Sequence, residues 1–129
     1  LVDLYRDFAE GITACQDEEG MWHQVLDDPD SYRETSCTGM FTAGLAYGIS
    51  EGLLDASYIK NVREGIHALL KYSVAENGVI QGVCRGSGRS MDREYYKRLG
   101  TVKDDDHGTG IILIAIDAAL EAEERLCRK

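Results

Sequence analysis

Residues 31–50 have the sequence SYRETSCTGMFTAGLAYGIS, and this stretch decides the fold. Ser31 followed three residues later by Glu34 forms a capping-box pattern, which predicts a helix that opens here and runs to about Ser50. Large apolar side chains recur along it at helical spacing, but glycine, alanine and threonine occupy its other sides. Small residues let neighbouring helices approach closely, at the expense of helix propensity. The stretch therefore predicts an interior helix.

One amphipathic helix is expected before this interior helix in the sequence, and a second one after it. Apolar residues recur at three- and four-residue steps over residues 1–18, and Gly20 ends that pattern. A second pattern of the same kind begins after Asp55 or Ser57 and ends at Asn77-Gly78. Each pattern places charged residues on the opposite side, so each helix is expected to bury one face and to lie on the outside.

A fourth helix is expected to begin near His107. It is apolar on all sides from Ile111 to Ala119, which predicts that its first half is buried. A long, glycine-rich connection, residues 78–103, precedes this helix and contains a pattern for one helical turn near residues 92–98.

The chain repeats itself with a shift of 58 residues. The shift places Leu1, Leu4, Phe8, Ile12, Gly20, Trp22 and Val25 over Ile59, Val62, Ile66, Leu70, Gly78, Ile80 and Val83. Each unit is an outer amphipathic helix, a loop with an apolar anchor and an inner helix rich in small residues. Helix pairs of this kind bury their apolar faces only against neighbouring pairs. We therefore expect an all-α fold with about four main helices, in which residues 1–129 form a single domain and part of an array or ring.

Two such pairs leave apolar faces open at both sides. The chain is therefore expected to form a homo-oligomer, for example a dimer, or to associate with a missing N-terminal half. Because the first residue is Leu rather than Met and no leader pattern follows, the chain is expected to begin inside a longer product.

The charge balance limits the partners. The 14 Lys and Arg residues against 23 Asp and Glu residues give a formal net charge of -9, which repels phosphate backbones and anionic lipid surfaces. The longest apolar run, residues 111–116, is much shorter than a membrane span. Neither a nucleic-acid partner nor a membrane partner is expected.

Neither a metal nor a cofactor is expected. The four cysteines, Cys15, Cys37, Cys84 and Cys127, are widely separated, without a CxxC pair or a histidine at ligand spacing. Reduced thiols, as in cytoplasmic proteins, are favoured, with a disulfide as the alternative. No phosphate-binding or dinucleotide-binding motif is present.

The connection before the fourth helix carries a local positive charge. Residues 85–103 hold six basic and two acidic residues, a local charge of +4. Gly86, Ser87 and Gly88 offer backbone amides to a ligand, and Tyr95-Tyr96 offers aromatic rings to a sugar. The stretch therefore predicts an anion-binding surface. The alternative is that its arginines balance nearby carboxylates such as those of Asp104 to Asp106.

Three further ring side chains have two interpretations each. Trp22, the only tryptophan, either stacks on a sugar or plugs the end of the helix layer, as its repeat partner Ile80 suggests. His23 and His107 either exchange protons or bind a carboxylate, or they hold loops in place. No pair of catalytic carboxylates can be assigned, because the aspartates are numerous and lie in turn-like stretches.

Four segments in order resemble one enzyme family. They are residues 20–28, which contain Gly-x-Trp-x-Gln-Val-Leu-Asp-Asp, residues 34–41, which contain Glu-Thr-Ser-Cys-Thr-x-Met-Phe, residues 82–96, and residues 106–110, which read Asp-His-Gly-x-Gly. Together they resemble the C-terminal half of the unsaturated rhamnogalacturonyl hydrolases, glycoside hydrolase family 105. Ser87 departs from the family pattern, where threonine is usual, but it keeps the hydroxyl group.

The resemblance implies a fold and an activity. The fold would be an (α/α)6 toroid of six helical hairpins, of which this chain holds only the C-terminal part. The activity would be that of a cytoplasmic glycoside hydrolase in pectin degradation, which protonates the vinyl ether of an unsaturated uronyl disaccharide and adds water. The general acid lies in the N-terminal half of the family fold, so no catalytic residue is expected in this chain.

The resemblance further implies that this part grips the substrate. The substrate-binding residues would be Trp22, His23, Arg85, Gly86, Ser87, Arg89 and His107, with Arg85 or Arg89 on the uronate carboxylate. The alternative function is a non-catalytic helical-repeat module that binds a carbohydrate or a protein partner.

Overall fold

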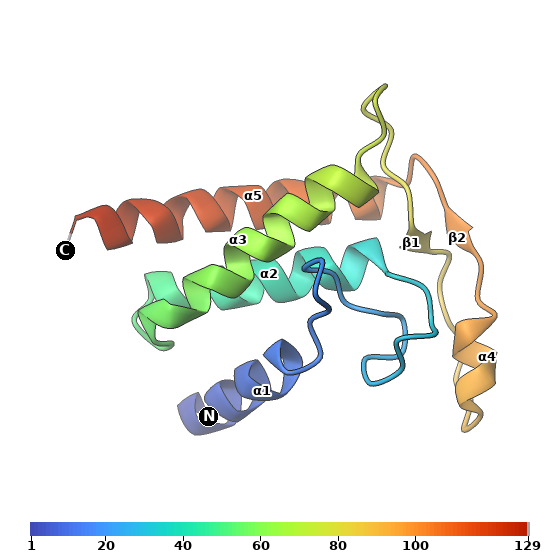
Figure 1. Cartoon of the computed structure of the whole chain (residues 1–129), viewed down its shortest axis with the longest axis horizontal. Helices are drawn as coiled ribbons and strands as arrows, with labels where there is room; N and C mark the ends of the chain where they lie inside the picture. Colours follow the sequence, from blue (N-terminus) through green and yellow to red (C-terminus); the bar gives the residue numbers. More distant parts are fainter. Residues whose placement is uncertain (129) are drawn as a thin grey trace.

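Helices dominate the computed structural model, which describes residues 1–128 (Figure 1). The α-helices are α1 (Val2–Thr13), α2 (Thr35–Ser50), α3 (Ile59–Ala68), α4 (Arg93–Lys97) and α5 (Asp106–Cys127). A 3-10 turn (Ala56–Tyr58) precedes α3, a π-helical turn (Leu69–Ser73) follows it, and two short strands, β1 (Val83–Cys84) and β2 (Thr101–Val102), pair with each other. The expected all-α fold with four main helices is confirmed, and α4 is the expected helical turn.

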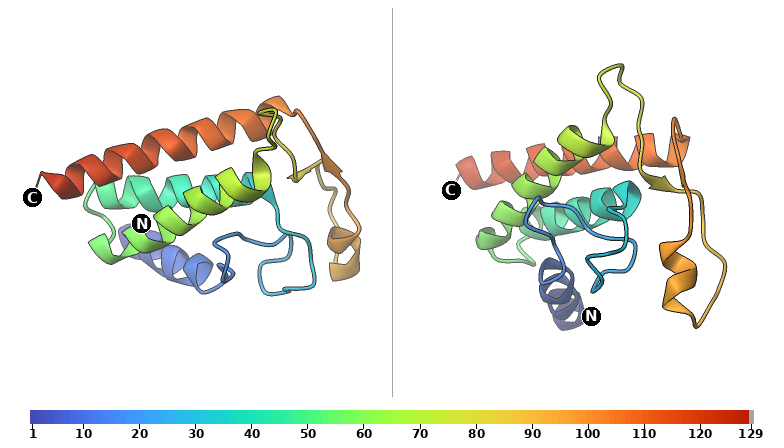
Figure 2. Two further views of the ribbon diagram at one scale, coloured as in Figure 1. Left: turned by 45° about the horizontal axis from the view of Figure 1, so that its top comes forward. Right: turned by 45° about the vertical axis from the view of Figure 1, so that its right-hand side comes forward.

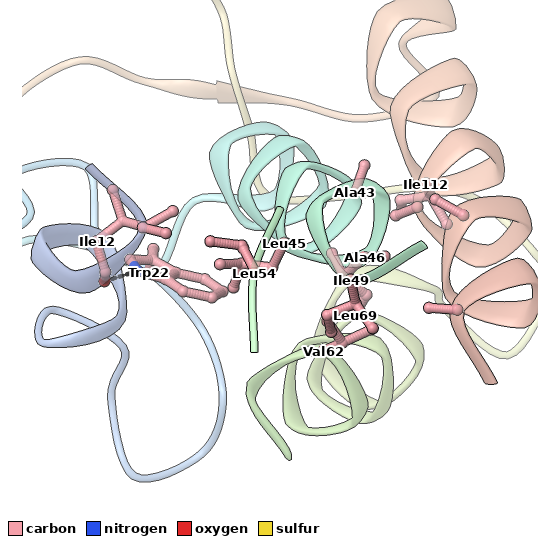
Figure 3. Packing of buried hydrophobic residues seen from close by; sticks show 14 of the residues in the cluster. Ile12, Trp22, Ala43, Leu45, Ala46, Ile49, Leu54, Val62, Leu69 and Ile112 are labelled. Carbon is pink, nitrogen blue, oxygen red and sulfur yellow. Dashed lines mark hydrogen bonds between the residues drawn. The ribbon is translucent and has the colours of Figure 1, made fainter. Parts of the chain in front are cut away.

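Helix α2 is the centre of the arrangement. It lies between α1 and α5, and α3 packs against both α2 and α5 (Figures 1 and 2). Buried residues occur around most of its circumference, so the expected interior helix is confirmed. Ala43 and Ala46 lie toward α5 and α3, whereas Leu45 lies toward the indole of Trp22 (Figure 3). Gly39 leaves room for Ile111 of α5, because a Cβ atom there would collide with the Ile111 side chain.

The start of α2 differs from the expected capping box. The N-cap is Glu34, whose backbone is extended and whose carboxylate accepts hydrogen bonds from the N–H groups of Ser36 and Cys37. The Ser31 hydroxyl instead donates to the Asp28 carbonyl (2.7 Å) and accepts from the Val25 N–H (3.1 Å). Ser31 therefore closes the preceding loop and does not open the helix.

Both outer helices end earlier than their periodicity predicted. Helix α1 stops at Thr13, because the Asp17 carboxylate accepts the N–H groups of Glu19 (3.0 Å) and Met21 (2.9 Å) and draws the chain into a turn. Helix α3 changes to the π-helical turn after Ala68. The repeat itself is visible in the loops, where Gly20 and Gly78 both take positive φ angles, 91° and 81°.

The expectation of a fully buried first half of α5 is wrong for one side of the helix. A single stripe is buried, made of Gly108, Ile112, Ala115, Ala118 and Ala122. Leu113 and Ile114 are 62% and 50% exposed. Helix α1 behaves likewise, since Leu4 and Phe8 of its predicted buried face are 66% and 57% exposed.

Two apolar surfaces result. The α1 face consists of Leu1, Val2, Leu4, Tyr5, Phe8 and Leu53. The α2/α5 face consists of Gly39, Met40, Ala43, Gly44, Tyr47, Ile111 and Ile114. Both are shallow hollows lined almost entirely by apolar atoms.

No helix among residues 1–128 has the length and apolar character to cross a lipid bilayer. The described histidine, cysteine, aspartate and glutamate side chains form no group of three that could ligate a metal ion. All four cysteines are free thiols.

Candidate anion-binding site

The basic connection of the sequence forms an arm that leaves the helical body. We call residues 85–100 the basic arm. It begins after β1 and returns through β2, and the two strands pair antiparallel with Val83 opposite Val102 and Cys84 opposite Thr101. None of its residues is buried. The arm, together with the N-terminal ends of α2 and α5, lies at one end of the fold (Figures 1 and 2).

Ion pairs tie the middle of the basic arm to the loop before α2. The Arg93 guanidinium donates to both carboxylate oxygens of Asp27 (2.7 and 3.1 Å), and Lys97 Nζ lies 3.2 Å from Asp28 Oδ2. The hydrogen bond from Lys97 holds the pKa of the Asp28 carboxyl below its usual value. Arg98 pairs within the arm with Asp92 (3.5 Å).

Half of the basic residues are thus neutralised, but by other partners than the sequence suggested. Their carboxylates are Asp27, Asp28, Asp92 and Glu94, not Asp104 to Asp106. For Arg85, Arg89 and Lys103, no carboxylate of residues 1–128 lies within 4.0 Å of the charged nitrogens. These three residues are exposed, so the anion-attracting character of residues 85–103 rests on them.

The arm holds its own loop in shape. The Tyr95 hydroxyl accepts the Gly88 N–H (2.9 Å), and the Tyr96 hydroxyl accepts the Ser90 N–H (3.0 Å). The two rings meet edge to face with centroids 5.1 Å apart. The Gly88 amide is therefore occupied by the protein. Gly86 has a φ of 108°, a conformation that side chains disfavour, and it turns the chain between the exposed residues on its two sides.

Arg85 lies at the root of the arm. Its backbone N–H donates to the Gly100 carbonyl (3.0 Å), and its guanidinium lies beside Gly100, where an added Cβ atom would stand 3.0 Å from Nη2. Ser87 and Arg89 follow in the same exposed stretch, and His107 is exposed in the first turn of α5. Arg85, Gly86, Ser87 and Arg89 therefore belong to one loop, and the N-terminal end of α5, which contains His107, lies at the same end of the fold (Figure 1).

The structure places Trp22 in the core. Its exposure is 0%, and its Nε1–H donates to the Ile12 carbonyl (2.6 Å; Figure 3). Its ring meets Phe41 edge on at a centroid distance of 5.5 Å. No face of the indole is open to a sugar. Of the two interpretations, the structure favours the core plug.

His23 has a supporting position. Its Nδ1 lies 2.5 Å from the Ser31 carbonyl and its Nε2 3.2 Å from Asp17 Oδ2. Arg33 Nε also donates to that oxygen (2.6 Å). Burial raises the pKa of Asp17, but hydrogen bonds from the Met21 N–H and Arg33 outweigh it, and the pKa lies below its usual value. Both His23 nitrogens are thus engaged in holding the loop.

Sequence reasoning missed the role of Asp17 and one of the two contacts of Glu34, two carboxylates that organise this end of the fold. Asp17 collects the loop contacts just described, and the turn-like stretch of residues 17–20 was the available signal. Glu34 was predicted as the capping-box partner of Ser31, but its buried carboxylate also links α2 to β1 through the Cys84 N–H (2.8 Å). That contact joins residues 50 positions apart, and local pattern does not reveal it.

A family model described as Glycosyl Hydrolase Family 88 matches residues 1–123. An unsaturated 3S-rhamnoglycuronyl hydrolase from Alteromonas sp. (strain LOR) is 36% identical over 124 residues, which cover 92% of this chain and 28% of the relative. An unsaturated rhamnogalacturonyl hydrolase from Bacillus subtilis (strain 168) is 34% identical over 122 residues, with coverages of 94% and 33%.

Solved structures show the same fold. A possible member of the GH105 family from Salmonella enterica superimposes with a TM-score of 0.87 at 23% identity and covers 95% of this chain and 32% of that chain. The likeness confirms the expected hairpins of an (α/α)6 toroid. The chain spans about a third of the length of these proteins.

Proposed function

Because the chain belongs to glycosyl hydrolase family 88, we propose that it is the substrate-gripping part of a cytoplasmic glycoside hydrolase that acts on unsaturated uronyl disaccharides derived from rhamnogalacturonan. The observation that carries the proposal is the basic arm, where Arg85 and Arg89 have no carboxylate partner among residues 1–128. A planar guanidinium with free donors matches a carboxylate in a two-point hydrogen bond.

Each remaining site residue has a distinct part in the proposal. Arg85 and Arg89 bind the uronate carboxylate, Ser87 and the turn at Gly86 bind a sugar hydroxyl, and His107 lies at the rim. Trp22 and His23 do not touch the sugar in this proposal, since the indole is buried and both imidazole nitrogens are engaged in the loop before α2.

The proton donor of the reaction is proposed to lie outside this chain. A general acid must hold a proton at working pH. Asp28 is a poor donor, because Lys97 lowers its pKa, and Asp27 is bound by Arg93. The two aspartates of the loop before α2 that lie beside the basic arm are thus engaged in ion pairs and are not available as proton donors.

We expect the charge of the ligand to decide the effect of changing the arm. Replacing Arg85 and Arg89 with alanine should weaken binding of an unsaturated uronide by about 10- to 100-fold, because a hydrogen bond to a charged group contributes roughly 1.5–3 kcal/mol. Binding of the matching uncharged analogue should change little. Isothermal titration of both ligands checks this, and Arg98→Ala, which removes an arginine paired inside the arm, is the control. Equal losses for both ligands would exclude the carboxylate role.

The chain alone is expected to leave the substrate intact. The vinyl ether of an unsaturated rhamnogalacturonan disaccharide absorbs ultraviolet light, and this absorbance should stay constant over hours with the 129-residue chain. Turnover that disappears on changing Asp27, Asp28 or His107 would show that the acid lies in this part after all.

The second candidate is a non-catalytic helical-repeat module. The two exposed apolar faces favour it, since such surfaces bind protein partners. Charge-selective binding of the uronide distinguishes the first candidate from a module whose partner is a protein.

A further inference from the structure

Glu34 carries a buried carboxylate with no ion-pair partner among residues 1–128. It is 2% exposed. Its oxygens accept hydrogen bonds from the N–H of Ser36 (3.1 Å), the hydroxyl of Ser36 (2.9 Å), the N–H of Cys37 (2.6 Å) and the N–H of Cys84 (2.8 Å). Three donors belong to the first turn of α2 and the fourth to strand β1.

A buried carboxylate is costly unless its oxygens are fully hydrogen-bonded. Here the donors at the N-terminus of α2 and the N–H group of strand β1 together satisfy the carboxylate oxygens, and the helix dipole favours the negative charge. Capping alone requires only a short side chain, and Ser, Thr, Asp and Asn are the usual caps. The extra methylene of a glutamate lets Oε2 accept from Cys37 while Oε1 reaches Cys84. The choice of glutamate is thus explained by the second contact.

The neighbouring residue reinforces the same junction. The Thr35 N–H donates to the Gly82 carbonyl (3.0 Å), and the Thr35 hydroxyl donates to the Gln81 carbonyl (2.6 Å). Gly82 has a φ of 76°, and a Cβ atom there would stand 2.8 Å from the Thr35 hydroxyl oxygen. The segment from Gln81 to Cys84 is therefore fixed to the start of α2 at three points.

The basic arm begins at the next residue. Because no residue of the arm is buried, its placement depends on this root, on the pairing of β1 with β2, and on the ion pairs with Asp27 and Asp28. The Arg93–Asp27 pair is exposed, and exposed ion pairs contribute little to stability, whereas the Lys97–Asp28 pair is partly buried. The root is the only buried polar anchor next to Arg85 among the contacts of residues 1–128.

We propose that Glu34 is a positioning residue, whose buried carboxylate fixes the root of the basic arm and so sets where Arg85 meets an anionic sugar. This inference rests on the proposed function and adds to it a residue that does not touch the ligand.

The test separates the two contacts of Glu34. Glu34→Asp keeps the charge and a good helix cap but is too short to reach Cys84. We expect the Cys84 and Arg85 amides to lose hydrogen-exchange protection while the Cys37 amide keeps it. Binding of an unsaturated uronide should fall about tenfold, in line with one hydrogen bond to a charged group, and binding of the uncharged analogue should hold.

The matched control is Asp55→Ala. Asp55 caps the 3-10 turn through the Ser57 N–H (2.8 Å), far from the arm (Figure 1). Asp55→Ala should lower the stability of the fold but leave uronide binding unchanged. That result would show that the loss of a helix cap does not by itself weaken uronide binding. The inference would be overturned if Glu34→Asp weakened binding of both ligands equally, or if the Cys84 amide kept its protection from hydrogen exchange. Glu34 would then have only a structural role.

The outcomes also distinguish the inference from the proposed function. If the Arg85 and Arg89 variants lose uronide binding but Glu34→Asp does not, the positioning role fails and the proposed function stands. If those arginine variants bind the uronide as the unchanged chain does, the proposed function fails, and this inference fails with it.

Discussion

Replacing Trp22 with alanine is expected to destabilise the fold by about 3–5 kcal/mol, the usual cost of removing a large buried aromatic side chain. The indole is fully buried, and it links α1 to α2 through its hydrogen bond to the Ile12 carbonyl and its contact with Phe41. The variant loses this packing, leaves a cavity between the helices and orphans a carbonyl group. Urea unfolding monitored by circular dichroism measures the change.

Met91→Ala is the control, because Met91 is 98% exposed on the basic arm and should cost no more than about 0.5 kcal/mol. The loss of stability in Trp22→Phe should lie between those of the two other variants, since phenylalanine keeps an aromatic ring but lacks the Nε1–H. A Trp22→Ala chain that kept its stability while losing sugar binding would contradict the buried position and restore the stacking role.

The repeat made much of this fold predictable. The 58-residue shift pairs Gly20 with Gly78 and Trp22 with Ile80, and the structure gives the two glycines similar positive φ angles and buries both apolar anchors. Periodicity and small-residue content also identified α2 as interior. These features are local, so a sequence pattern can express them.

Burial on the outer sides was not predictable in the same way. Periodicity shows which residues share a face, but it does not show whether another element covers that face. Phe8 and Ile114 fit apolar patterns, yet each is at least half exposed, because no element among residues 1–128 packs over it. The sequence therefore predicted which faces are apolar but overestimated how much of each face is buried.

The candidate site was predicted as a charged segment but not in its pairing. The count of +4 located the basic arm, whereas only the fold reveals that Arg93 and Lys97 are bound by carboxylates of the preceding loop. The Arg93 pair joins residues 66 positions apart. The same holds for Glu34, whose capping role is local but whose contact with Cys84 depends on tertiary structure.

The largest expected effect in solution concerns association. The α1 face and the α2/α5 face lie on different helices, and Leu4 and Ile114 are 66% and 50% exposed on them. Large exposed apolar patches are uncommon on monomers and mark interaction sites. We therefore expect the purified chain to form a homo-oligomer at tens of micromolar, or to bind further helices such as those that complete the toroid of its longer relatives.

Leu4→Glu and Ile114→Glu together should reduce the mass measured by light scattering to that of a single chain. Both positions are exposed in the isolated chain, so the glutamates are hydrated there and the fold should persist. Buried in an interface, an unpaired polar group costs at least about 2 kcal/mol, enough to weaken association roughly 30-fold. Met91→Glu adds the same charge on the basic arm and should leave the mass unchanged. An unaltered chain that is monomeric and binds no hydrophobic dye would show that these faces need no partner, because dye binding reports the same apolar surface that association would cover.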